Sequence, residues 1–164
     1  MVDFFNYLAE HGIAYERHDH PPVYTIEEAD RLVPPLSAAK TKNLFLRDSK
    51  GRQHFLVLVS GDKQVDIKGL QAVLGTSRLS FGSPKRLKEY LGIEPGAVSL
   101  FAVVNDTEHK VEVVADKTLW SASNFQFHPL VNTSTLVVSK EGVIRFLEST
   151  GHTPQVIEVP ERVA

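Results

Sequence analysis

The chain has 164 residues, of which 42% are hydrophobic and 23% charged, and its formal net charge is −2. A chain of this length buries roughly 70% of its unfolded surface, so we expect a single domain over residues 1–164. The absence of cysteine excludes disulfides, thiol nucleophiles and thiolate metal sites. There is neither an apolar run of about 20 residues nor a basic leader, so we expect a cytoplasmic protein without a membrane segment.

The small net charge argues against a protein that grips long stretches of nucleic acid, although local cations are compatible with a small footprint. Basic residues cluster at 40–52 and at 85–88. We interpret Arg47, Lys50 and Arg52 as the solvated tip of a hairpin.

The first quarter of the chain contains two predicted helices. Phe4, Phe5 and Leu8 share one face of a helix expected at Asp3–His11. A short extended segment follows, and two prolines then exclude a helix at 21–22. The Thr-Ile-Glu-Glu sequence at 25–28 is typical of a capping box and predicts a helix to about residue 32.

A hairpin is predicted in the middle of the chain. The apolar runs Leu44–Leu46 and Phe55–Val59 flank the turn-forming group Asp48–Gly51. Three polar residues, Lys40, Lys42 and Asn43, are expected at the mouth of the first strand. Because a cation and an amide at the end of a buried strand are held firmly, we place the candidate functional site here.

The remaining elements predict a mixed α/β domain with a largely antiparallel sheet. Capping residues and glycines delimit helices at 66–74, 84–91 and 141–149. Strands are expected at 78–81, 100–104, 111–115, 125–131, 135–138 and 155–159, with a turn at Pro95-Gly96.

No sequence motif for a nucleophile, a phosphate loop or a metal site is present. There is no G-x-S-x-G, and Lys63 lacks the glycine spacing of a P-loop. His18 and His20 lie two residues apart without a third ligand at a usual spacing, so we expect no metal and no cofactor. The prolines after His20 favour a role in a turn.

The other polar candidates each have a structural alternative. His128 before Pro129 is typical of a half-buried histidine at a bend, and Lys42 is also compatible with a surface lysine at a strand entry. The stretch 92–96 is either a helix end plus a turn, or a loop that offers N–H donors to a carbonyl oxygen. Thr133 and its neighbours are compatible with ordinary strand hydroxyls.

Five stretches together resemble one family. HDHPPVYTIEEA, KTKNLFLRD, LGIEPGAVS, VEVVADKTL and FHPLVNTSTLVVS occur in the order seen in the YbaK/ProX-type aminoacyl-tRNA deacylases, relatives of the editing domain of bacterial prolyl-tRNA synthetase. The resemblance covers nearly the whole chain and implies a barrel-like central sheet flanked by helices. It implies Lys42 and His128 as catalytic residues. The substrate-binding residues that it implies are Asn43, Gly92, Pro95, Gly96, Ser99 and Thr133. Relatives often carry proline where this chain has Leu100.

The resemblance implies hydrolysis of the ester between a mischarged amino acid and the terminal adenosine of a tRNA, most narrowly alanine on tRNA(Pro). Such an ester is already activated, so a positioned water suffices and no covalent intermediate is needed. The implied partners are a tRNA acceptor end and, transiently, prolyl-tRNA synthetase. Two alternatives stay open: another misacylated tRNA (Cys, Ser or Thr), or a catalytically silent module that binds tRNA or synthetase.

Overall fold

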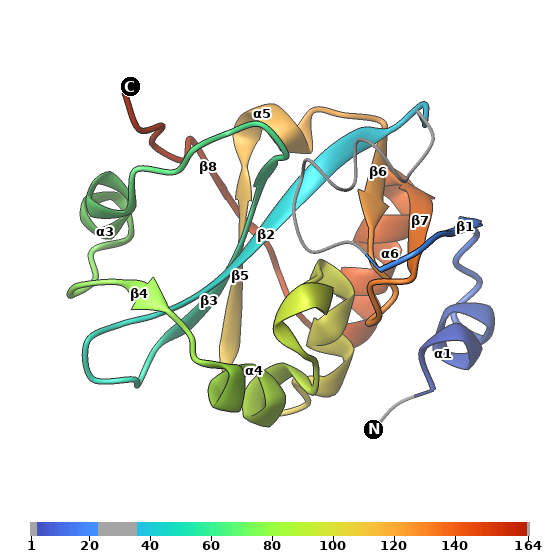
Figure 1. Ribbon diagram of the computed structural model, residues 1–164, viewed down its shortest axis with the longest axis horizontal. Helices are drawn as coiled ribbons and strands as arrows, with labels where there is room; N and C mark the ends of the chain where they lie inside the picture. Colours follow the sequence, from blue (N-terminus) through green and yellow to red (C-terminus); the bar gives the residue numbers. More distant parts are fainter. Residues whose placement is uncertain (1–2, 23–35, 164) are drawn as a thin grey trace.

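The computed structural model describes residues 3–22 and 36–163, and the helix expected at 25–32 lies outside them. The strands of one sheet dominate the described part (Figure 1). They are β1 (Glu16–Asp19), β2 (Ala39–Arg47), β3 (His54–Ser60), β4 (Ser80–Phe81), β5 (Val111–Asp116), β6 (Asn124–Phe127), β7 (Ser134–Ser139) and β8 (Gln155–Ile157). The strand order is β1-β7-β6-β2-β3-β5-β8, and β4 pairs with β2.

The sheet mixes antiparallel and parallel pairs. Strand β2 pairs antiparallel with β3 and β4, and β7 pairs antiparallel with β1 and β6. The β2–β6, β3–β5 and β5–β8 pairs are parallel. The mixed α/β class is therefore confirmed, and the parallel pairs qualify the expectation of a largely antiparallel sheet.

Strand β2 is longer than the apolar pattern predicted. It begins at Ala39, so Lys40, Lys42 and Asn43 lie within the strand and not at its mouth. The physical reason is that β2 changes partners: Ala39 and Lys40 pair with β6, whereas Thr41 onward pairs with β3. Polar residues are tolerated at this crossing because their side chains find partners on neighbouring elements.

Four predicted helices lie within the described residues and are confirmed as α1, α3, α4 and α6. The helices are α1 (Phe4–Glu10), α3 (Ile67–Leu74), α4 (Pro84–Leu91), α5 (Lys117–Trp120) and α6 (Lys140–Thr150). The side chains of Asp66, Ser83 and Ser139 accept hydrogen bonds from the N–H groups three residues on and so begin α3, α4 and α6. Each of these three helices ends at a glycine in the left-handed conformation. None of the described helices is both long and apolar enough to cross a bilayer.

Two sequence-based expectations were wrong. The apolar run at 100–104 forms a 3₁₀ helix, η2 (Leu100–Asn105), which follows another, η1 (Pro95–Ala97). All five residues from Leu100 to Val104 are buried, and a run buried all round has no periodicity that separates strand from helix. The strand expected to reach residue 131 ends at Phe127, and the short helix α5 was not predicted.

Strand β2 separates two apolar cores. Phe45 packs in the larger core with η2, α1, α4 and α6. Leu44 and Leu46 pack in a smaller core with α3 and with Val159, which follows β8. Gly82 lets the chain approach the larger core closely, because a Cβ there would lie 2.4 Å from the Phe45 ring. An alanine at position 82 therefore needs the buried ring to shift.

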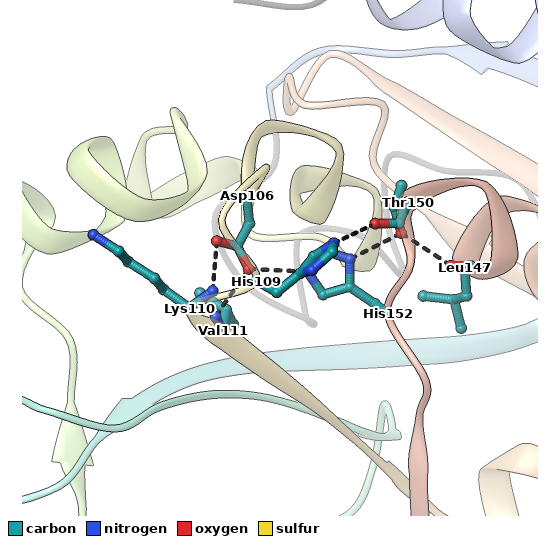
Figure 2. Close-up of polar contacts among 7 residues, drawn as sticks. All are labelled: Asp106, His109, Lys110, Val111, Leu147, Thr150 and His152. Carbon is teal, nitrogen blue, oxygen red and sulfur yellow. Dashed lines mark hydrogen bonds and ion pairs between the residues drawn. The ribbon is translucent and has the colours of Figure 1, made fainter.

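A buried hydrogen bond ties η2 and β5 to the end of α6 (Figure 2). Asp106 Oδ2 accepts a hydrogen bond from His152 Nε2 at 2.9 Å, and both side chains are 4% exposed. The same carboxylate accepts from the backbone N–H groups of Lys110 and Val111, each at 2.9 Å. Burial by itself raises the pKa of Asp106, but the hydrogen bonds from His152 and the two N–H groups outweigh it and lower the pKa.

Candidate functional site

Lys42 and Asn43 are neighbours on β2 and point to opposite faces of the sheet. Lys42 shares a face with Leu44, and Asn43 shares a face with Phe45, because side chains alternate along a strand. The half-buried Lys42 amine donates a hydrogen bond to the carbonyl oxygen of Lys63 at 2.9 Å. Its position is therefore defined by the loop that follows β3.

That loop is anchored in turn. The Lys63 amine lies 3.1 Å from Asp116 Oδ2, and the Asp116 side chain is 1% exposed. The other carboxylate oxygen of Asp116 accepts from the N–H of Val159 at 3.0 Å. Lys63 lies in the loop between β3 and α3, and the sequence did not show that this lysine orders the carbonyl that receives Lys42.

The Asn43 side chain joins β2 to the loop before η2. Its Oδ1 accepts a hydrogen bond from the N–H of Leu100 at 3.0 Å, and its Nδ2 donates to Thr41 Oγ1 at 3.3 Å. The Thr41 hydroxyl donates to the carbonyl oxygen of Gln126 on β6 at 2.5 Å. These three bonds connect β2, β6 and the stretch that ends at Leu100.

His128 follows β6 directly and is half-buried. Its Nδ1 lies 2.9 Å from the carbonyl oxygen of Ser134, and since a carbonyl only accepts, Nδ1 carries the hydrogen. Burial lowers the pKa of His128, the Ser134 carbonyl opposes this, and the nearby His20 lowers it further. The ring is therefore neutral at pH 7, and its Nε2 presents a lone pair.

The parallel register of β2 and β6 relates Lys42 to His128. Lys40 is the partner of Gln126, and both Lys42 and His128 come two residues later on strands that run the same way. The paired register ends at Lys40 and Gln126, so Lys42 and His128 each lie two residues beyond its last pair. This equal offset from one strand pair is the reason for considering them as one candidate site.

His20 is a further residue beside this site. Its ring centroid lies 6.3 Å from that of His128, and its Nε2 is 2.8 Å from Thr135 Oγ1. The prediction that it supports a turn agrees with its Nδ1, which is 2.8 Å from the Pro21 carbonyl oxygen. Its proximity to His128 was missed, because nothing in a spacing of 108 residues indicates contact. In the described part of the chain, no three His, Asp or Glu side chains gather as metal ligands.

The residues of the loop predicted to bind substrate belong to different elements. Gly92 ends α4 with φ 66°, and Pro95 and Gly96 lie in η1. Ser99 is fully buried, and its Oγ accepts from the N–H of Phe101 at 3.2 Å. The Asn43–Leu100 hydrogen bond attaches this loop to the face of β2 opposite Lys42.

The segment after His128 is the other exposed part of the site. Thr133 is exposed, and its carbonyl oxygen accepts from the N–H of His20 at 3.0 Å. Leu130 has φ 69°, a conformation that is uncommon for residues other than glycine and often found at functional sites. Its side chain packs against the larger core, which stabilises the strained backbone.

The chain matches the model of the aminoacyl-tRNA editing domain over residues 20–146. It therefore belongs to this family, and the expectation of an aminoacyl-tRNA deacylase is confirmed at the level of the family.

Individual relatives agree with this assignment. The chain is 44% identical over 152 residues to the prolyl-tRNA editing protein ProX of Acetoanaerobium sticklandii, covering 93% of each chain. It is 37% identical over 141 residues to the prolyl-tRNA synthetase associated domain-containing protein 1 of Danio rerio, covering 85% of this chain and 76% of that protein. The crystal structure of hypothetical protein APE2540 superposes with a TM-score of 0.73 at 20% identity, covering 94% of this chain and 97% of the other. That likeness concerns the fold alone.

Proposed function

We propose that this protein hydrolyses the ester of alanine mischarged onto tRNA(Pro) and releases alanine and free tRNA(Pro). The observation that carries the proposal is the β2–β6 register of a chain of the editing family, in which Lys42 and His128 each follow the Lys40–Gln126 pair by two residues. The 44% identical relative from Acetoanaerobium sticklandii is a prolyl-tRNA editing protein, which supports tRNA(Pro) as the carrier.

The proposed chemistry uses water as the nucleophile. Water attacks the ester carbonyl, the carbonyl oxygen becomes negatively charged, and the ribose oxygen leaves with a proton. The Lys42 ammonium stabilises the negative charge or holds the phosphate of the terminal nucleotide, as a compact charge with three donors. The free ribose hydroxyl of the substrate assists in activating the water, and His128, neutral at pH 7, orders the pocket or accepts a hydrogen bond.

Other residues would position the substrate. The stretch from Gly92 to Ser99 is the candidate source of N–H donors for the carbonyl oxygen, and Thr133 is the candidate contact on the loop after His128. Asn43 contributes by tying Leu100 to β2. The role given to each of these residues is part of the proposal.

Selection of alanine over proline would rest on exclusion, because a small pocket rejects a bulkier side chain by steric clash. Three apolar residues near these positions, Leu44, Phe45 and Val131, are candidates to line the pocket, but Leu44 and Phe45 are buried in the two cores, at 9% and 3% exposure. Val131 is 48% exposed on the loop after His128. We therefore favour Val131 as the candidate lining residue among the three.

A deacylation assay with the purified protein tests the proposal. Ala-tRNA(Pro) should be hydrolysed and Pro-tRNA(Pro) spared. Lys42→Ala should lower the rate about a hundred-fold or more, since one transition-state contact typically contributes about 2–4 kcal/mol. Lys117→Ala, at an exposed lysine on α5, is the matched control and should leave the rate unchanged.

Other outcomes separate the alternatives. Faster hydrolysis of Cys-, Ser- or Thr-charged tRNA than of Ala-tRNA(Pro) would assign the protein to another misacylated substrate. Binding of tRNA without turnover of any substrate would indicate a silent binding module. Full activity of Lys42→Ala would remove this lysine from the mechanism.

A further inference from the structure

The modest net charge hides a strong asymmetry along the chain. Residues 47–88 contain nine of the 18 Lys and Arg residues but only three of the 20 Asp and Glu residues, a net charge of +6. The rest of the chain therefore carries a net charge of −8. Local charge, not the total, decides whether a surface attracts a polyanion.

This segment forms one continuous part of the molecule: the β2–β3 turn, α3 and β4 lie on the left of Figure 1, and α4 lies at its bottom. The Oγ atoms of Ser49 in the turn and Ser77 before β4 lie 2.9 Å apart. Arg86 on α4 approaches His54 Nε2 at 3.0 Å and the Gly51 carbonyl oxygen at 3.5 Å. These contacts place the turn next to the segment before β4 and next to α4, and Lys68 on α3 lines one hollow with Arg78.

We call this surface the basic face. Its exposed members are Lys50, Arg52, Lys68, Arg78, Lys85 and Lys88, and its half-buried members are Arg47 and Arg86. Only Lys88 among the exposed members forms an ion pair with a carboxylate of the described residues, to Glu94 at 3.3 Å.

Two of the three acidic residues in the segment are directed to the backbone. Asp48 is 8% exposed and accepts from the N–H groups of Arg52 and Gln53 at 2.8 and 3.1 Å. Asp66 accepts from the N–H of Gly69 at 3.1 Å and begins α3. These two carboxylates bond to peptide N–H groups and, among the described residues, form no ion pair with the basic side chains of the segment.

The basic face also contains an exposed aromatic side chain beside a hollow. Phe81 on β4 is 63% exposed. It lines a hollow of about 580 Å³ together with Lys68, Gln71 and Arg78. Cations next to an accessible aromatic ring are typical of surfaces that bind nucleic acid, where phosphates meet the cations and the ring packs on bases or sugars.

We propose that the basic face binds the phosphate backbone of the tRNA whose 3′ end occupies the Lys42–His128 site, a proposal that rests on the proposed function. Lys50 lies eight residues after Lys42 along β2 and its turn, which corresponds to at most about 26 Å at about 3.3 Å per residue. A double helix carries one phosphate per about 1.7 Å of axis, so a stem of that length presents roughly 15 negative charges. On this proposal, Arg47, Lys50 and Arg52 at the hairpin tip bind phosphates together with cations from α3, β4 and α4.

The test compares a neutralised basic face with a matched control. The first variant combines Lys50→Gln, Arg52→Gln and Arg78→Gln, and the control combines Lys110→Gln, Lys117→Gln and Lys140→Gln outside the segment. Each is assayed on mischarged full-length tRNA and on an aminoacyl-adenosine ester, which fills the site without reaching the basic face. Binding of uncharged tRNA is measured in parallel over a range of salt concentrations.

The basic-face variant should raise KM for the tRNA roughly tenfold or more and lower the slope of log K against log salt by about 3. Its kcat and its activity on the aminoacyl-adenosine ester should be unchanged, and the control should match the wild type. Unchanged tRNA binding and an unchanged salt slope would overturn the proposal. Binding of polyglutamate to the same variants is a further check. The proposal would also be overturned if the basic-face variant lost polyglutamate binding but kept tRNA binding, because that result would indicate an acidic protein partner.

The measurement of tRNA binding separates this proposal from the proposed function. If no mischarged tRNA is hydrolysed by the wild type, the deacylase function fails. Weaker, less salt-dependent binding of uncharged tRNA by the basic-face variant would still support the basic face.

Discussion

Replacing Asn43 by alanine should destabilise the protein and slow deacylation, because it removes the acceptor for the Leu100 N–H. Leu100 is fully buried, so its N–H would lose its only side-chain acceptor and find no water. An unsatisfied buried donor costs about 1–3 kcal/mol, and loss of the longer Nδ2–Thr41 bond adds about 0.5–1 kcal/mol. We expect a total loss of about 2–3 kcal/mol in the free energy of unfolding.

The Leu100→Pro variant allows a sharp test of this reasoning. Proline has no N–H. In the Leu100→Pro background, Asn43→Ala therefore leaves no backbone donor at position 100 unpaired and should lower the free energy of unfolding by only about 1 kcal/mol. The backbone tolerates the change, since Ser99 has φ −153° and ψ 148° and Leu100 is the first residue of η2. Any loss of leucine packing occurs in both backgrounds and cancels in the double-mutant cycle.

Urea titrations measure the free energies of unfolding, and single-turnover deacylation measures the activity of the site. A coupling of about 1–2 kcal/mol is expected between positions 43 and 100. Asn43→Asp, which keeps an acceptor oxygen for the Leu100 N–H, should cost less stability than Asn43→Ala. Equal costs of Asn43→Ala in the leucine and proline backgrounds would refute the proposed hydrogen-bond role.

Two further predictions concern titratable groups. The lowered pKa of His128 means that the unfolded chain binds the proton first, so stability should fall as the pH drops below about 6.5, and His128→Asn should flatten this dependence in urea titrations. Asp106→Ala should cost about 3–5 kcal/mol, because it leaves His152 and two N–H groups buried without their acceptor. Since the pKa of Asp106 is lowered, its contribution to the free energy of unfolding is complete above about pH 4 and is lost as the pH falls through the folded-state pKa. Calorimetry of the wild type and of Asp106→Ala checks this, and a difference in stability that persists at the lowest pH would contradict it.

Features that depend on a few neighbouring residues could be predicted from the sequence. The helices begun by Asp66, Ser83 and Ser139 follow local capping chemistry, and the hairpin around the turn at 48–51 follows strand periodicity. The resemblance of five ordered stretches also identified the family. All of these signals lie within about ten residues of one another or in short motifs.

The tertiary structure decided the rest, because it depends on pairs far apart in the chain. The run at 100–104 is apolar on every side, and only its place between two helices and the sheet makes it 3₁₀ instead of strand. The parallel β2–β6 pairing sets Lys40 beside Gln126, although 86 residues separate them. Likewise, cations from the turn, α3, β4 and α4 form one basic face only after folding. Local patterns specify which elements form, whereas long-range pairing specifies which side chains meet.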